Sequence, residues 1–259
     1  QNRYACQPNL PRRTEQPCVE PFVGAAAAFC YAYNNCLFRN AIINDNDDEL
    51  IKIYITIRDN NKELVECLFD LMSGFPYGEN GEVRREFIFN IVQPYFNSTC
   101  SPLEKTALFY ILRRNWFNGM YKGRNNNINH LTNNGPIQMI DANNLKNWEV
   151  ALQHCEILCG DYKSIAIPSD AFVYVDPPYF IESMSHRVGY KHNFSNLEQQ
   201  RCIDWCKSVS SKTVRVVLSN SDSDLIRSYL TGYADIYKMR LFYATARRMA
   251  TEILAVFKP

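Results

Sequence analysis

The segment of this chain best suited to chemistry is Asp176-Pro177-Pro178-Tyr179. A carboxylate oxygen and a proline carbonyl are both hydrogen-bond acceptors, so together they can take the two N–H hydrogens of an exocyclic amine on a nucleobase. Such an amine is a poor nucleophile until its hydrogens are held in this way. The ring of Tyr179 can stack on a base that has been flipped out of a duplex. The segment therefore indicates a site for a nucleobase amine.

The local sequence places this segment at the end of a β-strand. Residues 173–175, Val-Tyr-Val, have strong strand propensity, and neither following proline can donate to a sheet, so the strand is predicted to stop at Asp176. Two consecutive prolines fix their own φ angles and restrict the residues before them, which predicts a stiff turn. The alternative is an ordinary Pro-Pro turn, with Asp176 as a surface acceptor and Tyr179 as a packing residue.

The composition is that of a globular protein. The chain has 259 residues, of which 46% are hydrophobic and 13% aromatic, enough for one large domain or two small ones. No stretch approaches the roughly 18 consecutive apolar residues of a membrane-spanning helix. Residues 1–17 also lack the apolar core of a signal peptide. We therefore expect no membrane partner.

The ten cysteines are spread along the chain and include no Cys-x-x-Cys pair. Cys155 and Cys159 are four residues apart, as are Cys202 and Cys206. This spacing predicts amphipathic helices in which a free thiol acts as a small apolar group. We expect reduced thiols, no zinc or other metal site, and an intracellular protein.

A segment near the N-terminus has the order of a nucleotide-binding βαβ unit. Residues 19–24 are predicted to form a short strand and a turn, residues 25–33 a helix, and residues 41–45 a second strand that ends in Asp45. In such units the acidic residue accepts hydrogen bonds from ribose hydroxyls. The glycine content is low for this motif, because alanines follow Gly24. The alternative is a plain βαβ unit in which Asp45 opens the charged start of a helix.

The stretch from residue 105 to residue 140 carries positive charge and no negative charge. It has no Asp or Glu, whereas the whole chain has a net charge of +1. Its basic residues are Lys105, Arg113, Arg114, Lys122 and Arg124. A helix is predicted through residues 107–117, followed by a turn at Asn118-Gly119. This local charge is suited to a polyanion such as a nucleic acid, and the alternative is a solvated polar hairpin.

Several segments, in this order and spacing, resemble the Dam-type (D12 class, alpha group) DNA adenine-N6 methyltransferases. VEPFVGA at residues 19–25 resembles the cofactor motif of that family, and IINDNDDEL at 42–50 its ribose-binding acid motif. NWFNGMYKGRNNNIN at 115–129 is similar to its target-recognition hairpin. CGDY at 159–162 resembles the acid-aromatic pair near the cofactor adenine, and VYVDPPYF at 173–180 the catalytic motif. The resemblance extends over most of the chain.

The resemblance implies an α/β fold, namely a Rossmann-like S-adenosylmethionine-dependent methyltransferase sheet with an inserted, mostly helical target-recognition region. Residues 1–52 and 144–259 would form the catalytic methyltransferase domain. Residues 53–143 would form the inserted DNA target-recognition region, with a hairpin near 117–136. The implied activity is site-specific transfer of a methyl group from S-adenosyl-L-methionine to N6 of a flipped adenine in double-stranded DNA.

The resemblance also implies roles for single residues. The catalytic turn would be Asp176, Pro177, Pro178 and Tyr179. The cofactor would be bound by Phe22, Gly24, Ala25, Asp45, Asp161, Tyr162 and Asp176, with Asp45 on its ribose and the pair 161–162 around its adenine. DNA would be bound by Arg113, Arg114, Asn118, Met120, Lys122 and Arg124, of which the two arginines would contact phosphates. No metal is implied.

A second hypothesis is a catalytically silent relative that keeps the fold as a nucleic-acid-binding or structural subunit of a larger assembly. The alanines after Gly24 favour this hypothesis, whereas the intact Asp176-Pro177-Pro178-Tyr179 turn favours an active enzyme. An RNA substrate or a cytosine N4 amine also stays open, although Asp in place of Ser at position 176 leans toward adenine. For an active enzyme we expect the cytoplasm or nucleoid of a bacterium, or a virus-infected cell.

Overall fold

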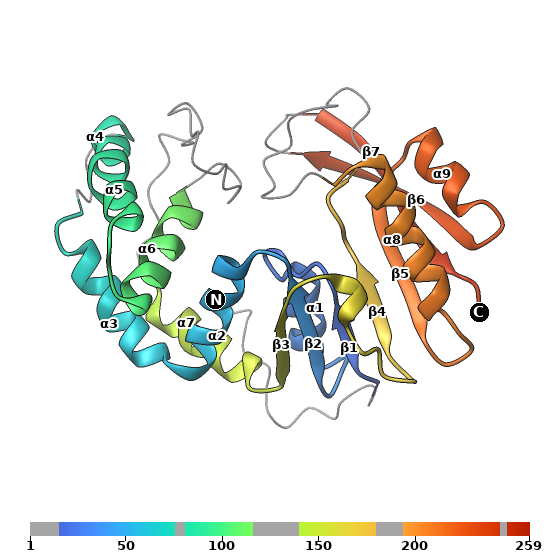
Figure 1. The fold of residues 1–259 in the computed structure, drawn as a ribbon, viewed down its shortest axis with the longest axis horizontal. Coiled ribbons are helices and arrows are strands. Elements are labelled where there is room, and N and C mark those ends of the chain that lie inside the picture. The colour runs from blue at the N-terminus through green and yellow to red at the C-terminus, as the bar shows by residue number, and fades with distance from the viewer. Residues whose placement is uncertain (1–15, 76–80, 116–139, 180–193, 244–247) are drawn as a thin grey trace. The chain divides into compact units, whose positions relative to one another are not determined.

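The structure is a computed structural model, and it describes residues 16–75, 81–115, 140–179, 194–243 and 248–259. These residues divide into two compact units. The first holds the sheet and consists of the residues up to Asn46 and most of those from His154 onward. The second runs from Asp47 to Gln153, and its described part is helical (Figure 1).

Within the described residues, the first unit forms a seven-stranded sheet in the order β3-β2-β1-β4-β5-β7-β6. Strands β1 to β5 run parallel to their neighbours among themselves, while β7 is antiparallel to both β5 and β6. This doubly wound α/β sheet confirms the predicted fold class. The strands are β1 Cys18–Glu20, β2 Ala41–Asp45, β3 Cys155–Cys159, β4 Phe172–Val175, β5 Arg215–Ser221, β6 Ala234–Tyr243 and β7 Arg248–Phe257.

The strands that carry the candidate site form where the sequence predicts them. Strand β4 ends at Val175 and Asp176 follows it directly, as the two prolines after it require. Near the N-terminus, β1, helix α1 (Ala27–Asn34) and β2 give the predicted strand-helix-strand order, and β2 ends on Asp45. The predicted βαβ unit is confirmed.

The helix predicted across Cys155 and Cys159 is wrong. These two residues bound strand β3, which pairs in parallel with β2 along its whole length. Side chains four residues apart share a face in a strand as well as in a helix, so this spacing does not distinguish the two. Cys202 and Cys206 do lie on a helix, α8 (Asn196–Val209), and are buried against the sheet. None of the cysteines in the described part forms a disulfide.

Alternation along the strands sends neighbouring side chains to opposite faces of the sheet. Val19, Val173 and Val175 enter one hydrophobic cluster, which also contains side chains of α8 and of α9 (Asp224–Leu230). Figure 1 shows α8 beside β5. Glu20, the neighbour of Val19, points the other way, where its Oε2 accepts the backbone N–H of Phe29 in α1 at 3.0 Å. Both faces of the central strands are therefore covered.

The helical unit is the connection between the parallel neighbours β2 and β3. Its helices are α2 Asp48–Asp59, α3 Asn61–Met72, α4 Gly81–Phe87, α5 Gln93–Asn97, α6 Pro102–Asn115 and α7 Ala142–Leu152. Side chains of Asp47 and Asp141 cap α2 and α7. The helix predicted through residues 107–117 is confirmed as far as Asn115 by α6.

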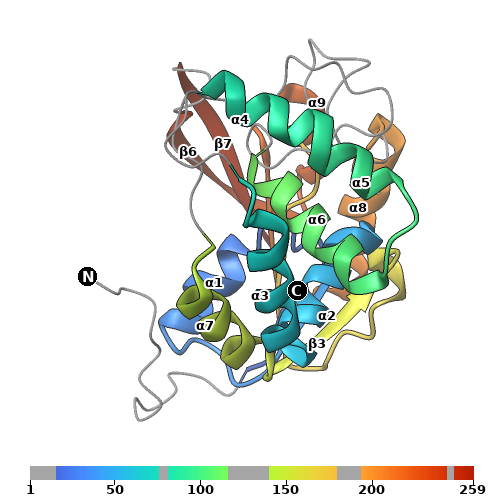
Figure 2. The same cartoon turned by 90° about the vertical axis from the view of Figure 1, so that its left-hand side faces the viewer.

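A π-helical turn, Ile88–Val92, joins α4 to α5, and Figure 2 shows the three pieces as one continuous rod. Pro94 lies just after this turn and has no N–H to donate to the preceding turn. The missing donor explains why the regular α pattern is interrupted here.

Candidate active site

The carboxyl ends of β1 to β5 share one edge of the sheet, and the strand order reverses between β1 and β4. In open α/β sheets, ligands bind outside the carboxyl ends of the strands at such a reversal. Glu20 ends β1 and Asp176 follows β4, so two carboxylates lie beside this point. Their proximity is reflected in the raised pKa of Glu20, to which the charge of Asp176 contributes.

Asp176 is accessible but incompletely solvated. The residue is exposed, yet desolvation by the surrounding protein raises its pKa above the ordinary value of 3.8. A hydrogen bond from Tyr179 lowers the pKa in part. A carboxylate in such surroundings is a strong acceptor for an incoming N–H donor, because water competes less for its oxygens.

The hydroxyl of Tyr179 anchors the far end of the turn. It lies 2.5 Å from Ser219 Oγ on β5 and 3.3 Å from Glu252 Oε2 on β7. Ser219 and Glu252 are buried, with exposed fractions of 2% and 7%. A tyrosine hydroxyl has one proton, which it can donate to only one of the two carboxylates, Asp176 or Glu252, at a time, while the Ser219 hydroxyl can donate to its oxygen. The tip of the ring is thus held by two strands of the sheet.

We expect Tyr179→Phe to move the acid limb of the kcat profile to higher pH. The variant keeps the ring but loses the hydrogen bond that lowers the pKa of Asp176, so the carboxylate takes up its proton at a higher pH. Protonated Asp176 is a weaker acceptor, and kcat falls with it. Kinetics across the acidic range measure this shift. Tyr233→Phe, at an exposed tyrosine, is the control; a limb that stays in place in Tyr179→Phe contradicts the role of the hydroxyl.

Hydrogen bonds tie together the carboxyl ends of β1, β2 and β3. The N–H of Gly24 donates to Asp45 Oδ2 at 3.0 Å. The side-chain amide of buried Asn44 donates to the carbonyls of Pro21 at 2.9 Å and Gly160 at 3.0 Å. Gly24 has a φ of +47°, which favours glycine, and a Cβ added there would meet nothing within 4 Å. The structure therefore brings together Gly24 and Asp45, with exposed Ala25 following them.

Phe22 belongs to a cluster of aromatic side chains that pack in tilted and edge-to-face arrangements. The ring of half-buried Phe22 lies 4.9 Å from that of Tyr162, which in turn lies 5.3 Å from Trp205 on α8. Tyr162 is only 6% exposed, and its buried hydroxyl has no hydrogen-bond partner among the described residues. Tyr162 therefore supports Phe22 from behind. Asp161 is exposed, and its Oδ1 accepts the N–H of Lys163 at 3.0 Å.

Glu20 is a buried carboxylate, 4% exposed, and it was not among the predicted site residues. Burial is the main cause that raises its pKa to about 8, offset in part by the N–H of Phe29 and reinforced by Asp176. By accepting the Phe29 N–H, it satisfies a donor in the first turn of α1. Glu20 thus connects the start of α1 to the reversal point of the sheet.

The predicted DNA-binding residues fall into two groups. Arg113 and Arg114 end α6, where Arg114 is exposed and its Nη1 donates to the hydroxyl of Tyr110 at 2.9 Å. The guanidinium of half-buried Arg113 lies 5.9 Å from the centre of the Phe109 ring. Residues Asn118, Met120, Lys122 and Arg124, like the predicted hairpin, lie outside the described residues.

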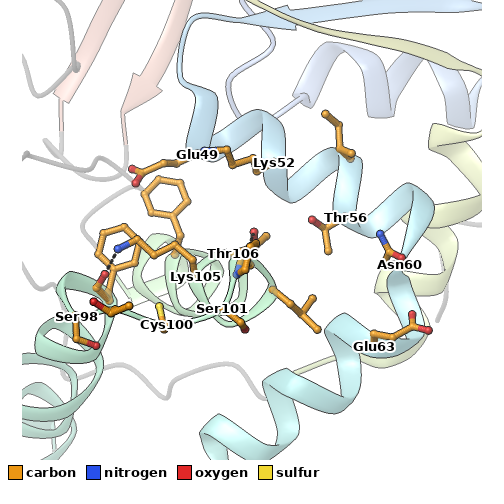
Figure 3. A pocket seen from close by; sticks show the side chains of 16 residues that line it. Glu49, Lys52, Thr56, Asn60, Glu63, Ser98, Cys100, Ser101, Lys105 and Thr106 are labelled. Carbon is orange, nitrogen blue, oxygen red and sulfur yellow. Dashed lines mark hydrogen bonds between the residues drawn. The ribbon is translucent and has the colours of Figure 1, made fainter.

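The helical unit also contains a cavity of about 870 Å³ between α2, the start of α3 and residues 96–109 (Figure 3). Two lysines line it, and both have partners. Lys52 Nζ pairs with Asp48 at 3.0 Å, and Lys105 Nζ lies 4.2 Å from the centre of the Phe96 ring. The lining includes none of the residues predicted to bind cofactor or DNA.

Sequence reasoning missed the polar side chains that hold the site from behind. Besides Glu20, these are Gln199, Ser219, Asn220 and Glu252, and all are buried. One signal was available, because Gln199 shares the inward face of α8 with Cys202, Ile203 and Cys206. Burying a polar side chain on such a face costs free energy unless the side chain is hydrogen-bonded. A glutamine at this position therefore indicates a specific hydrogen-bond partner.

This sheet, with an acid at the end of β2 and the Asp-Pro-Pro-Tyr turn after β4, defines a Rossmann-like methyltransferase. The sequence profile of the D12 class N6 adenine-specific DNA methyltransferases matches residues 6–245. The chain belongs to this family, as the sequence motifs predict. It is therefore an enzyme that transfers a methyl group to adenine N6 in DNA from a methyl donor, and the family match gives no support to the silent alternative.

Curated relatives agree with this assignment. The type II methyltransferase M.MjaIII of Methanocaldococcus jannaschii is 29% identical over 227 residues, covering 82% of this chain and 78% of its own length. The DNA adenine methylase of Escherichia coli is 27% identical over 250 residues, covering 93% and 86%. The rRNA methyltransferase aviRa from Streptomyces viridochromogenes covers 95% of this chain and 78% of its own, with 9% identity and a TM-score of 0.36, too weak a likeness to bear on fold or function.

Two kinds of feature are absent from the part of the chain that the structure describes. No helix there has both the length and the hydrophobicity needed to cross a membrane. No group of three His, Cys, Asp or Glu side chains there could hold a metal ion.

Proposed function

We propose that the methyl donor is S-adenosylmethionine and that the acceptor is an adenine flipped out of double-stranded DNA onto the Asp176-Pro177-Pro178-Tyr179 turn. The observation that best supports this is the position of two acids at one edge of the sheet. Asp45 ends β2 and Asp176 follows β4, on the two sides of the reversal point. Asp45 is suited to bind the methyl donor, and Asp176 is suited to bind the target amine.

The residues at the ends of β1, β2 and β3 fit S-adenosylmethionine. Asp45 can accept hydrogen bonds from ribose hydroxyls. Phe22, supported by Tyr162, offers a ring edge or face, and the space beside Gly24 and Ala25 admits close approach of a ligand to the backbone. Exposed Asp161 can accept from the amine of the cofactor adenine. When bound, the cofactor supplies a methyl group on a positively charged sulfur.

On the acceptor side, Asp176 and the Pro177 carbonyl would take the two N–H hydrogens of the target amine. The carbonyl of Pro178 is already engaged, since Gln199 Nε2 donates to it at 2.7 Å. As the methyl group moves to the amine nitrogen, the N–C bond forms while its bond to sulfur breaks. The positive charge passes from sulfur to nitrogen, where the Asp176 carboxylate would stabilise it until the nitrogen loses one proton to water. Tyr179 would stack on the base. The rest of the rate enhancement would come from alignment of the two bound groups.

The helical unit supplies the candidate DNA-recognition region, which we place at residues 53–143 within it, with the catalytic domain at 1–52 and 144–259. Arg113 and Arg114 at the end of α6 would contact phosphates, and Asn118, Met120, Lys122 and Arg124 would follow on the hairpin near 117–136. The positive charges of Arg113, Arg114, Lys122 and Arg124 support this role.

Calorimetric titration tests the cofactor assignment. We expect S-adenosylmethionine to bind the wild-type protein and Asp45→Ala to weaken binding roughly 10-fold to 100-fold, since hydrogen bonds to a charged group are worth about 1.5–3 kcal/mol each. Asp48→Ala, at an acid paired with Lys52 on the surface of α2, is the control and should bind normally. If the wild type shows neither heat nor a thermal shift at saturating cofactor, the assignment fails.

A further inference from the structure

The catalytic turn has few ways to be held in place. Pro177 and Pro178 have no backbone N–H, so this stretch cannot be tied down by donating hydrogen bonds. Apart from the backbone N–H groups of Asp176 and Tyr179, the groups that can hold the turn are its carbonyls and the side chains of Asp176 and Tyr179. If Asp176 is to stay available for a substrate, the carbonyls and Tyr179 must bear the restraint.

A relay of two buried side-chain amides reaches one of these carbonyls. The backbone N–H of Ser221 donates to Asn220 Oδ1 at 2.8 Å, and Asn220 Nδ2 donates to Gln199 Oε1 at 3.0 Å. Gln199 Nε2 then donates to the Pro178 carbonyl at 2.7 Å. Gln199 and Asn220 are both 0% exposed. The relay connects strand β5, helix α8 and the turn, and each amide can work in one orientation only.

Stability alone does not account for these amides. Gln199 lies on the face of α8 that packs against the sheet, together with Cys202, Ile203 and Cys206. An apolar side chain at this position would pack within the same hydrophobic cluster. A buried amide loses its hydration, and the net gain from its hydrogen bonds is only about 0.5–1.5 kcal/mol each. What a fully satisfied buried network does provide is a single geometry.

We propose that Gln199 and Asn220 are positioning residues for methyl transfer. By holding the Pro178 carbonyl, they fix the plane of the peptide that leads into Tyr179 and leave the Pro177 carbonyl as the second acceptor beside Asp176. The proposal rests on the proposed role of the turn as the receptor of the target amine. It adds two residues that touch neither substrate nor cofactor.

Gln199→Met is the direct test, because methionine keeps the length of the side chain and removes both amide groups. We expect kcat to fall about 10-fold to 100-fold, as for a small misplacement of reacting groups, while the dissociation constants for DNA and S-adenosylmethionine stay unchanged. Gln200→Met is the matched control on the same helix, since Gln200 donates to Asp204 at the surface and not to the turn. It should keep full activity.

Asn220→Asp tests the relay from its other end. An Asp carboxylate still accepts the Ser221 N–H but cannot donate to Gln199 Oε1, so the Gln199 amide turns over and presents its oxygen to the Pro178 carbonyl. We expect a loss of kcat similar to that in Gln199→Met. The double variant should lose no more than the worse single one, because both changes act through the same bond. The single variant Asn220→Asp also provides the test if Gln199→Met does not fold.

Asp176→Ala, measured alongside, separates the two hypotheses. Suppose that kcat is normal in Gln199→Met and in Asn220→Asp, while Asp176→Ala loses activity. That result contradicts the positioning role of Gln199 and Asn220 and leaves the turn as the acceptor site. Losses that multiply in the double variant also contradict the positioning role. If Asp176→Ala keeps its activity, the proposed role of the turn fails, and the relay with it.

Discussion

Asp176→Ala is expected to lower kcat by about 10²-fold to 10³-fold, the usual cost of removing one preorganised group that stabilises charge in a transition state. The positive charge on the target nitrogen appears only as the methyl group arrives, so the carboxylate acts mainly on kcat. Binding of S-adenosylmethionine should change much less, because Asp45 and not Asp176 would hold the ribose. Single-turnover methyl transfer to DNA, with calorimetry for the cofactor, measures both quantities.

Asp170→Ala is the matched control for this prediction. Asp170 is an exposed acid just before β4, so it lies at the opposite end of the same strand from Asp176. Its removal should leave kcat unchanged. Asp176→Asn should lie between wild type and Asp176→Ala, since an amide oxygen still accepts but carries no charge. Equal rates in Asp176→Ala and wild type would show that Asp176 takes no part in methyl transfer.

Glu20→Gln is expected to raise the free energy of unfolding at alkaline pH by as much as a few kcal/mol, at about 1.4 kcal/mol per pKa unit. The folded-state pKa of Glu20 is raised from 4.5 to about 8. Between these values the folded protein keeps a proton that the unfolded chain releases. The contribution of Glu20 to stability is therefore full below the lower pKa and is lost as pH rises through the upper one.

Glutamine does not titrate, and its amide oxygen can still accept the Phe29 N–H. Urea denaturation at several pH values should therefore show the variant and the wild type converging in acid and separating as pH rises. Glu156→Gln, at an exposed position in β3, should follow the wild type. Parallel curves for Glu20→Gln and wild type would mean that Glu20 is not held in the apolar surroundings that the structure shows.

The strands and acids of the site were predictable because their signals are local. Two prolines stop β4 at Val175 whatever the rest of the chain does, and this fixes the place of Asp176. The strand-helix-strand order that brings Asp45 to the sheet edge is likewise contained in about thirty residues. By contrast, β3 was wrongly predicted as a helix. Two cysteines four residues apart share a face in a helix and in a strand alike, and only the pairing with β2 decides between the two.

The supports of the turn were not predictable in this way. Gln199 reaches Pro178 across 21 positions of the chain, and Glu252 reaches Tyr179 across 73. These contacts exist because α8 packs against β5 and because β5 and β7 pair beside β4, which are properties of the whole unit. The sequence of α8 shows that Gln199 is out of place on an apolar face, but it does not show which group the amide serves.

The helical unit begins just after β2 and ends just before β3, two strands that are hydrogen-bonded to each other from Ala41 to Asp45. It is in effect one enlarged loop of the sheet. Among the residues that the structure describes, none of the hydrogen bonds that hold the Asp176 turn or link Asp45 to Gly24 comes from this unit. The unit that would select the DNA sequence can therefore change in length and composition as a module, while the catalytic residues of the sheet unit stay the same. Different sequence preferences could arise on one unaltered sheet by exchange of a single connection.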